Sequence, residues 1–533
     1  MNKPVLQVNN LSVVFGRDQK VVDGVSFEIA QGETFALVGE SGSGKSLTAL
    51  SVLRLLPRNA KLTARSIKLG DLDLMAMAEF DLCRVRGRRI ALIFQDPMSS
   101  LNPVLTIGRQ IEEVLEIHQS LPANAIKSRV VELLKMVELP NPDARMGDFP
   151  HQLSGGQRQR VMIAIALAGN PELLIADEPT TALDVTIQAQ ILDLLKSIQK
   201  QTGMALLLIS HDLALVSNRA DRIAVMQQGK IVETGKSSSL FKRPTHLYTQ
   251  KLMAALPLLE HSIRTDKPGS EVVCRIESFK VYYPIRKGVF KRVVDHVKAV
   301  DDVSFDIQRG KTLALVGESG CGKTTLGKAL LNLIPVTAGR VLLDGIEINR
   351  LSGEVLRKKR AEVQIVFQDP FSSMNPRMLV GEIIEEGIKA LRPEIDNIER
   401  QRRVFELLRQ VDLPEESAHR YPHEFSGGQR QRICIARALA VEPKLIVCDE
   451  PTSALDVSVQ AQIIALLKLL QQQKGISYLF ITHDLALVAE IADDVAVMLG
   501  GKIVEYGRVE KVLMHPDHVY TKTLLNAVPQ LQI

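Results

Sequence analysis

GESGSGKS, at residues 39–46, decides the fold, and the stretch returns as GESGCGKT at residues 317–324. Each copy follows an apolar, strand-like run and precedes a helical pattern, which is the setting of the GxxxxGK[ST] phosphate-binding loop. The glycines let backbone N–H groups turn toward phosphate oxygens, and the positive N-terminus of the next helix adds to the attraction. Two copies in the same setting make a chance match negligible.

The last two residues of each loop have separate expected roles. Lys45 and Lys323 are expected to contact the terminal phosphates of a bound nucleotide, and the hydroxyls of Ser46 and Thr324 to bind Mg²⁺. The nucleotide-binding positions predicted in the two loops are Gly39, Glu40, Ser41, Gly42, Ser43, Gly44, Lys45 and Ser46, and then Gly317, Glu318, Ser319, Gly320, Cys321, Gly322, Lys323 and Thr324.

The two loops belong to a longer internal repeat in the chain of 533 residues. HQLSGGQRQR (151–160) returns as HEFSGGQRQR (423–432), and IADEPTTALDVTIQAQI (175–191) returns as VCDEPTSALDVSVQAQI (447–463). The offset at both pairs is 272 residues. Self-similarity on this scale predicts two domains of one fold.

The repeat sets the expected boundaries, a first domain at 1–257 and a second at 272–533. Between them, residues 258–271 (LLEHSIRTDKPGSE) are polar, contain Pro and Gly and match nothing in the other half, as expected of a linker. Short apolar runs such as TFALVG and LLIAD alternate with helical patterns, which predicts an α/β sheet in each half. From about 96–153, and again from about 369–425, the pattern is helical, so we expect an inserted helical subdomain in each half.

Composition indicates a folded protein, and its net charge argues neither for nor against an anionic partner. Hydrophobic residues make up 45% and charged residues 24%, and the net charge of +5 is small beside 66 basic and 61 acidic side chains. No run of 18 apolar residues occurs, and the N-terminus lacks the apolar stretch of a signal peptide, so we expect the chain to stay in the cytoplasm. The five cysteines are scattered without CxxC spacing, which indicates neither a disulfide framework nor a zinc site.

An acidic pair ends an apolar run in each half, at Asp177 with Glu178 and at Asp449 with Glu450. Because successive side chains of a strand point to opposite faces, we expect the aspartate to bind Mg²⁺ and the glutamate to polarise the attacking water. Solvated acids at a strand end would explain one pair. They do not explain two pairs that each lie 23 residues after the serine of an SGGQ stretch.

SGGQ upstream of an Asp-Glu strand end, with a lone histidine 34 residues after the aspartate, resembles the ATP-binding cassette ATPases over nearly the whole chain. The resemblance implies an α/β fold with two P-loop (RecA-like) nucleotide-binding domains, each with an inserted helical subdomain. It also implies ATP and Mg²⁺ as ligands and ATP hydrolysis coupled to transmembrane transport. In that family two cassettes pack head to tail, and each nucleotide lies between the phosphate loop of one and the SGGQ signature of the other. Here the two halves would form that pair within one chain.

The resemblance assigns two composite sites. The first would combine residues 39–46, Gln95, Asp177, Glu178 and His211 with Ser426, Gly427, Gly428 and Gln429. The second would combine residues 317–324, Gln368, Asp449, Glu450 and His483 with Ser154, Gly155, Gly156 and Gln157. The positions expected to take part in hydrolysis are Glu178, Glu450, His211, His483, Gln95 and Gln368. Those expected to bind Mg²⁺ are Ser46, Gln95, Asp177, Thr324, Gln368 and Asp449.

Four further positions complete the implied ATP sites. Asp184 and Asp456 match the loop that crosses between cassettes. Phe15 and Tyr283 are the aligned candidates for stacking on adenine, with core packing as the alternative for either. Near Tyr283 the second half carries the basic stretch RKGVFKR (286–292), for which a solvated surface hairpin is favoured over contact with lipid or a permease.

FQDPMSSLNP and FQDPFSSMNP, with YPHEFSGGQRQR and the terminal PTHLYT and PDHVYT segments, resemble the peptide and nickel importer branch. The stretch YPIRKGVFKRVVDH most closely resembles the fused two-cassette ATPases of Yej-type oligopeptide and microcin C importers. The resemblance implies a peripheral ATPase subunit at the cytoplasmic face of the inner membrane that energises import of short peptides or peptide-like compounds. Its implied partners are two permease subunits and, indirectly, a periplasmic substrate-binding protein, with no nucleic acid. Related single-cassette subunits carry a C-terminal cysteine cluster, and its absence from this sequence predicts no iron–sulfur centre.

Three alternatives remain at this point. The fused ATPase of a glutathione importer is a near rival, because the importer's substrate is chosen by other subunits. A soluble twin-cassette translation factor typically carries a long charged helical linker, and the linker expected at 258–271 is too short. DNA-repair cassettes need inserted coiled coils or zinc fingers, whose heptads and CxxC motifs the sequence lacks.

Overall fold

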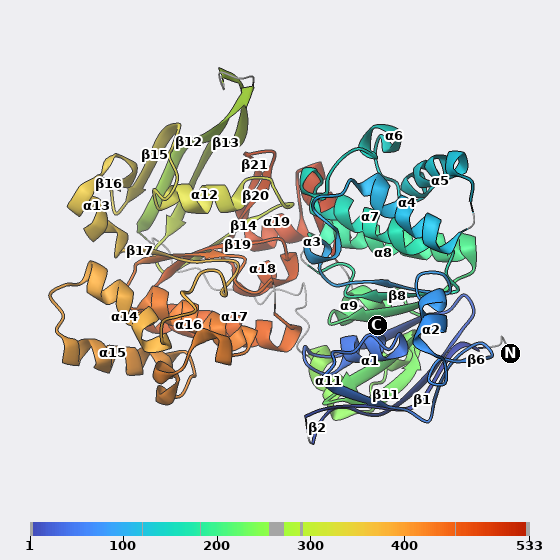
Figure 1. Ribbon diagram of the computed structural model, residues 1–533. Coiled ribbons are helices and arrows are strands. Elements are labelled where there is room, and N and C mark those ends of the chain that lie inside the picture. The colour runs from blue at the N-terminus through green and yellow to red at the C-terminus, as the bar shows by residue number, and fades with distance from the viewer. Residues whose placement is uncertain are drawn as a thin grey trace. The chain divides into compact units, whose positions relative to one another are not determined.

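Two compact units make up the chain, one within Met1–Leu256 and one within Pro257–Val528 (Figure 1). The computed structural model describes residues 4–16, 18–119, 121–181, 183–254, 271–287, 292–453 and 455–528. The linker predicted at 258–271 lies outside the described residues except for Glu271.

An antiparallel sheet and a mostly parallel sheet form the β-structure described in the first unit. The strands are β1 Pro4–Phe15, β2 Gln19–Ala30, β3 Thr34–Val38, β4 Ala60–Thr63, β5 Ser66–Leu69, β6 Leu72–Asp73, β7 Ile90–Ile93, β8 Leu173–Asp177, β9 Ala205–Ser210, β10 Arg222–Gln227 and β11 Lys230–Lys236. The antiparallel sheet has the order β2-β1-β5-β6, with β4 also paired to β1. The larger sheet has the order β11-β10-β3-β9-β8-β7, and only β11 in it is antiparallel to its neighbour.

Helices of the first unit alternate with these strands or gather between β7 and β8. They are α1 Lys45–Val52, α2 Glu79–Val85, α3 Pro97–Ser100, α4 Ile107–His118, α5 Ala123–Met136, α6 Pro142–Arg145, η1 Pro150–Gln152, α7 Gly155–Leu167, α8 Val185–Thr202, α9 Leu213–Ser217, α10 Ser237–Leu240 and α11 Leu247–Ala254. Residues 96–153, the predicted helical subdomain, contain α3 to α6 and η1. In α4, Ile107, Ile111 and Leu115 recur every four residues and are fully buried, so one face of this helix packs inward.

The described part of the second unit repeats this order of elements except that it has no counterpart to β4 or α3, the 3-10 helix Ile348–Arg350 is additional, and the 3-10 helix Glu415–His419 stands in place of α6. Its strands are β12 Val272–Lys287, β13 Arg292–Gln308, β14 Thr312–Val316, β15 Ala338–Leu343, β16 Ile346–Glu347, β17 Val363–Val366, β18 Leu445–Asp449, β19 Ser477–Thr482, β20 Asp494–Leu499 and β21 Lys502–Arg508. Its helices are α12 Lys323–Leu330, η2 Ile348–Arg350, α13 Gly353–Arg360, α14 Val380–Leu391, α15 Asn397–Gln410, η3 Glu415–His419, η4 Pro422–Glu424, α16 Gly427–Leu439, α17 Val457–Lys474, α18 Leu485–Ile491, α19 Val509–Met514 and α20 Val519–Ala527. The sheets have the orders β13-β12-β15-β16 and β17-β18-β19-β14-β20-β21.

The described residues of the basic stretch at 286–292 are Arg286, Lys287 and Arg292, and they lie where β12 and β13 pair. The register runs outward through Arg286 with Val293 to Lys287 with Arg292, and residues 288–291 lie outside the described part of the chain. Val293 and Val294 are each about half exposed.

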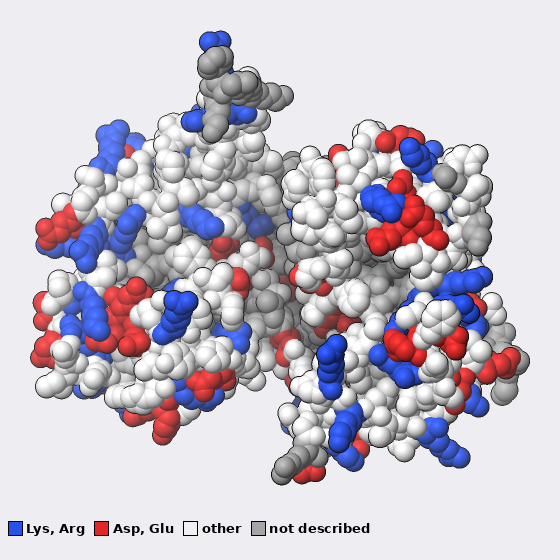
Figure 2. All heavy atoms as spheres, viewed as in Figure 1, with Lys and Arg blue, Asp and Glu red and all other residues white. Residues whose placement is uncertain are grey.

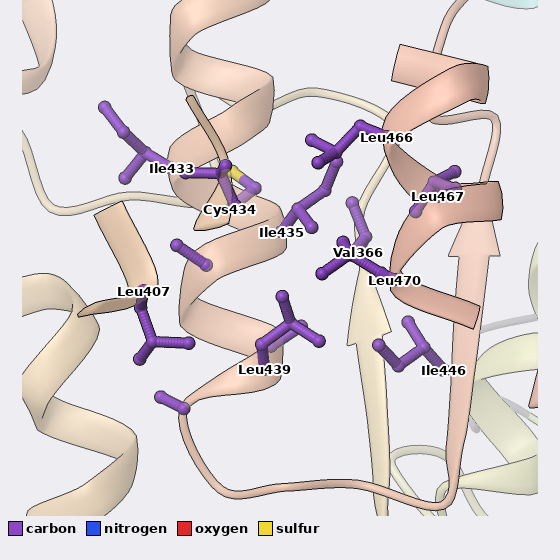
Figure 3. Close-up of a cluster of buried hydrophobic side chains, with 14 of the residues drawn as sticks. Val366, Leu407, Ile433, Cys434, Ile435, Leu439, Ile446, Leu466, Leu467 and Leu470 are labelled. Carbon is purple, nitrogen blue, oxygen red and sulfur yellow. The ribbon is translucent and has the colours of Figure 1, made fainter. Parts of the chain in front are cut away.

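The central strands are buried along their whole length. Every residue of β8, β9, β18 and β19 is buried, which explains why these strands are unbroken apolar runs in the sequence. In each unit one face of the parallel sheet packs against the antiparallel sheet and the helix that follows the phosphate loop. In the second unit one buried cluster joins the sheet to the helical region (Figure 3). There Ile435 of α16 points toward Leu466 of α17 and Val366 of β17, so α16 anchors the helical region on the sheet. Each such side chain contributes about 1.5–3 kcal/mol through burial.

The charged side chains are mixed in sign over the surface. On the face that Figure 2 shows, lysines and arginines are interspersed with aspartates and glutamates on both units, as the small net charge predicts. Among the described residues, no helix has both the length and the apolar character that a membrane span requires.

Candidate ATP-binding and hydrolysis sites

The loop between β3 and α1 is built on glycines that no other residue can replace without strain. Gly39 and Gly44 have φ of 156° and 101°. A Cβ would lie 2.2 Å from the carbonyl oxygen of Met226 at Gly39, and 2.8 Å from a neighbouring strand's carbonyl at Gly44. The equivalent positions of the second loop, Gly317 and Gly322, are equally tight, at 2.2 and 2.0 Å from backbone oxygens. Close backbone packing is therefore a second reason for glycine at these positions, beside the backbone conformation that a phosphate-binding loop requires.

The loop lysine is buried and held by the loop itself. The Nζ of Lys45 donates to the carbonyl oxygens of Gly39 at 2.8 Å and Glu40 at 2.9 Å, and the residue is only 4% exposed. Lys323 makes the same two contacts in its own loop, at 2.7 and 2.9 Å. A positive charge therefore lies inside each loop, where phosphate oxygens would meet it.

A hydroxyl and a carboxylate meet beside each loop. Ser46 Oγ donates to Asp177 Oδ1 at 3.0 Å, and Thr324 Oγ1 donates to Asp449 Oδ1 at 2.9 Å. Burial raises the pKa of Asp177 to about 6, against the opposing effect of the Ser46 hydrogen bond, and burial likewise raises the pKa of Asp449. Mg²⁺ fits this set, because it prefers oxygen ligands and would balance a carboxylate whose charge burial penalises.

The glutamate that follows each aspartate has a left-handed backbone conformation. Strand alternation predicts that the two acids divide between two faces, but β8 ends at Asp177 and Glu178 turns to φ 47°. Its N–H donates to the carbonyl of Ile209 on β9 at 3.0 Å, and Glu450 repeats this at φ 46° with a bond of 2.9 Å. Such a backbone costs about 1–3 kcal/mol and persists only where its surroundings enforce it.

The Glu178 carboxylate lies beside two other predicted residues of its half, Gln95 and His211. Glu178 Oε2 accepts from Gln95 Nε2 at 2.8 Å and from Thr181 Oγ1 at 3.0 Å, and it lies 3.2 Å from His211 Nδ1. Thr181 is a contact that the sequence interpretation missed. The structure therefore brings Gln95, Glu178 and His211 together at the carboxyl edge of the sheet.

The second half repeats this cluster with one change. Glu450 Oε2 accepts from Gln368 Nε2 at 3.0 Å and lies 3.4 Å from His483 Nδ1. Ser453 stands at the position of Thr181, but its hydroxyl donates to the backbone carbonyl of Glu450, at 3.2 Å, instead of to the carboxylate.

The glutamate and the histidine each favour the charged form of the other. Burial opposes the charge on Glu178 and His211, but their mutual contact outweighs burial, so the pKa of Glu178 is lowered and that of His211 is raised. The pKa values of Glu450 and His483 shift in the same directions for the same reasons. Each glutamate is therefore a carboxylate near neutral pH, the form that can accept a proton from water.

The SGGQ signature forms the start of a helix in each unit. Ser154 Oγ accepts from the N–H of Gln157 at 3.3 Å, and the Gln157 side chain accepts from the N–H of Ser154 at 3.1 Å. Ser426 and Gln429 form the same reciprocal cap on α16, at 3.4 and 3.0 Å. The signature thus presents a preformed, positively polarised helix end.

The second signature glycine is required by packing. A Cβ at Gly156 would lie 2.8 Å from Ile187 Cγ2, and one at Gly428 would lie 2.3 Å from Val459 Cγ1. The glycine therefore lets the signature helix approach the next long helix, α8 or α17. The pairing of each loop with the signature of the other half stays a prediction.

The remaining predicted residues lie in different settings. Asp184 caps α8, its Oδ1 accepting from the N–H of Ile187 at 2.9 Å, whereas Asp456 makes no side-chain cap bond on α17. Phe15 packs partly buried against the core at the end of β1, and Tyr283 on β12 is 42% exposed. Stacking of either ring on adenine stays a prediction.

Two tyrosines that the sequence interpretation missed contact the loops. Tyr248 Oη accepts from the N–H of Glu40 at 3.2 Å, and Tyr520 Oη accepts from the N–H of Glu318 at 3.0 Å. Both belong to the repeated PTHLYT and PDHVYT segments, so the repetition of a tyrosine there was the available signal.

Comparison with known proteins identifies the family. The family model described as ABC transporter matches residues 22–181 and 300–453. The chain belongs to this family. A second model, described as the C-terminal region of oligopeptide/dipeptide transporters, matches residues 232–280 and 504–533. The ABC halves and their C-terminal segments thus follow one another twice along the chain.

Relatives resemble the ABC chain over nearly its full length. It is 50% identical to the peptidoglycan transport ATP-binding protein YejF of Agrobacterium fabrum, over 98% of this chain and 96% of that protein. It is 48% identical to the uncharacterized ABC transporter ATP-binding protein YejF of Escherichia coli, over 98% and 99%. It is 45% identical to the glutathione import ATP-binding protein GsiA of Salmonella typhimurium, over 99% and 90%.

These findings confirm the predicted family and its fold class, a P-loop α/β fold present twice. The ABC chain is an ATP-binding protein that hydrolyses ATP to power transport.

We expect Asp177→Asn to stabilise the nucleotide-free, Mg²⁺-free protein at pH 8. Because the pKa of Asp177 is raised from 3.8 to about 6, its ionisation destabilises the fold above pH 6 and does not do so below pH 4. The amide removes this cost, up to about 3 kcal/mol, and the gain should shrink as the pH falls through 6. Urea denaturation in EDTA at pH 8 and pH 5 measures the difference.

Asp449→Asn is the matched variant in the second half and should shift stability in the same direction. A gain of equal size at both pH values, or none at pH 8, would contradict the burial argument.

Proposed function

We propose that this ATPase energises the import of short peptides or peptide-like compounds, with ATP bound at two composite sites between its halves. The observation that carries the proposal is that each half holds the same set of groups: a phosphate loop, a hydroxyl–carboxylate pair, and a glutamate bonded to glutamine beside a histidine. The match to the oligopeptide/dipeptide transporter C-terminal region in both halves supports a peptide-like substrate.

In the proposed mechanism, Glu178 and Glu450 accept a proton from the water that attacks the γ-phosphate. Gln95 and Gln368 hold these carboxylates by hydrogen bonds, and the histidine beside each carboxylate stabilises its charge. Mg²⁺, bound by Ser46, Asp177 and Gln95 in the first half and by Thr324, Asp449 and Gln368 in the second, would neutralise phosphate charge.

Replacing both glutamates, as Glu178→Gln with Glu450→Gln, should preserve ATP binding and slow turnover by about 10²–10⁴-fold, because the amide cannot take the proton. Phosphate release and equilibrium ATP binding measure the two effects. Glu172→Gln is the control. Glu172 pairs with Arg89 just before the start of β8, at the opposite end of that strand from Asp177 and the site. Unchanged hydrolysis in the double variant would refute the assigned roles.

The proposed composite arrangement is the one that the resemblance to the ATP-binding cassette ATPases implies. The described groups around Lys45 supply cations and a metal site on one side of a nucleotide, and the capped end of a signature helix would supply N–H donors to the γ-phosphate from the other. We propose that residues 426–429 complete the site of Lys45 and residues 154–157 complete that of Lys323. Neither half alone would form a complete site.

A photoreactive ATP analogue tests this arrangement in the Lys323→Ala variant, where the first loop alone retains its lysine. Label should appear in residues 426–429, and Ser426→Ala should reduce it. The reciprocal Lys45→Ala variant should give label at 154–157. Label only at 154–157 in the Lys323→Ala protein would show that each half binds ATP by itself.

We propose that the chain works at the cytoplasmic face of the inner membrane with two permease subunits and, indirectly, a periplasmic substrate-binding protein. Glutathione import is the second candidate, favoured by the 45% identity to a glutathione import protein. Affinity purification from native membranes tests both. Two permeases with a binding protein that carries peptides support the first candidate, and bound glutathione the second. Ribosomal proteins in their place would contradict both.

A further inference from the structure

The C-terminal segment of each half reaches back to the phosphate loop. In the first unit, α11 carries Tyr248, whose hydroxyl accepts from the N–H of Glu40 at 3.2 Å. In the second, α20 carries Tyr520, whose hydroxyl accepts from the N–H of Glu318 at 3.0 Å. The two partners are more than 200 residues apart in sequence in both cases, so the contact is a tertiary one that the chain makes twice.

The tyrosine and the loop lysine hold one peptide group from opposite ends. The peptide that joins Gly39 to Glu40 offers its carbonyl to Lys45 Nζ at 2.8 Å and its N–H to Tyr248 Oη. Because the peptide is planar and trans, these two groups point in opposite directions, and the two bonds together fix its orientation. The second half repeats this with Lys323, at 2.7 Å.

Each tyrosine is itself held in place by its segment. Glu233 of β11 accepts from the N–H groups of Thr245 at 2.8 Å and His246 at 3.2 Å, and His246 Nδ1 accepts from the N–H of Tyr248 at 3.2 Å. These bonds tie the start of α11 to the sheet.

The second half has the same chain of bonds. Glu505 of β21 accepts from the N–H groups of Asp517 at 2.8 Å and His518 at 3.1 Å, and His518 Nδ1 accepts from the N–H of Tyr520 at 3.1 Å. A rigid support therefore runs from the last strand of each sheet to the first peptide of each loop.

We infer that Tyr248 and Tyr520 are positioning residues for the phosphate-binding loops, and that the C-terminal segments set ATP affinity through them. The inference rests on the proposed role of the loops, in which Lys45 and Lys323 turn from the loop carbonyls to the phosphates of ATP. When the lysine leaves, the tyrosine hydroxyl remains as the bond that holds the first peptide of the loop. Loss of the hydroxyl lets this peptide rotate, so the loop must be ordered again when ATP binds.

The Tyr248→Phe and Tyr520→Phe double variant of the full chain tests the inference, since phenylalanine keeps the ring and removes only the hydroxyl. We expect the Kd for ATP and the KM of hydrolysis to rise by about three- to ten-fold, the effect of one lost hydrogen bond at each site, with kcat changed less than about two-fold. Thermal denaturation without nucleotide should remain close to that of the unmodified chain.

Tyr506→Phe is the matched control. Tyr506 lies on β21 in the same C-terminal region, and its hydroxyl donates to the backbone carbonyl of Asp306 at 3.4 Å and not to the loop. ATP affinity in this variant should not change. An unchanged Kd in the double variant, or a loss no larger than that of Tyr506→Phe, would overturn the inference.

Two further results separate the possible failures. A fall in kcat at constant KM would overturn the inference by placing the tyrosines in the chemical step. Lys45→Ala with Lys323→Ala must abolish ATP binding, and retained binding there would refute the proposed role of the loops themselves. With binding lost in the lysine variant and weakened in the tyrosine variant, both the role of the loops and the inference hold.

Discussion

The hydrogen bond from the N–H of Glu178 to the carbonyl of Ile209 is the interaction on which the geometry of the first site depends. It joins the end of β8 to the end of β9, the strand that leads to His211. Because β3, β9 and β8 are neighbours in one parallel sheet, the phosphate loop, the acidic pair and the histidine all emerge at the same edge. The bond from Glu450 to Ile481 has the same role in the second half.

The sequence predicted those parts of the site that consist of residue types with a fixed spacing. The loops, the acidic pairs, the glutamines and the histidines lie where their motifs indicate, because each follows directly on a buried strand of recognisable pattern. The left-handed turn at Glu178 could not be predicted, since glutamate has no preference for positive φ and only the surrounding strands impose it. The contact of Tyr248 with the phosphate loop could not be predicted either. It joins residues 208 positions apart and uses a backbone N–H group, which every residue type except proline has.

The two halves share their architecture and differ in detail. Cys321 replaces Ser43 in the loop, and its Sγ lies 3.8 Å from the Nζ of Lys323. Thr181 bonds its glutamate's carboxylate, whereas Ser453 bonds the backbone of Glu450. Each half therefore has the hydroxyl–carboxylate pair, the glutamine and the histidine, but among the described contacts the first glutamate has one more hydrogen-bond donor than the second.

The reciprocal cap of Ser154 and Gln157 also bears on how a site could be assembled. The serine hydroxyl and the glutamine side chain order the first turn of α7 by themselves. The conformational entropy lost in ordering that turn is therefore a cost of folding and not of ligand binding. A phosphate group that reaches this helix end meets N–H donors whose directions are already fixed, so little of its binding energy is spent on ordering them.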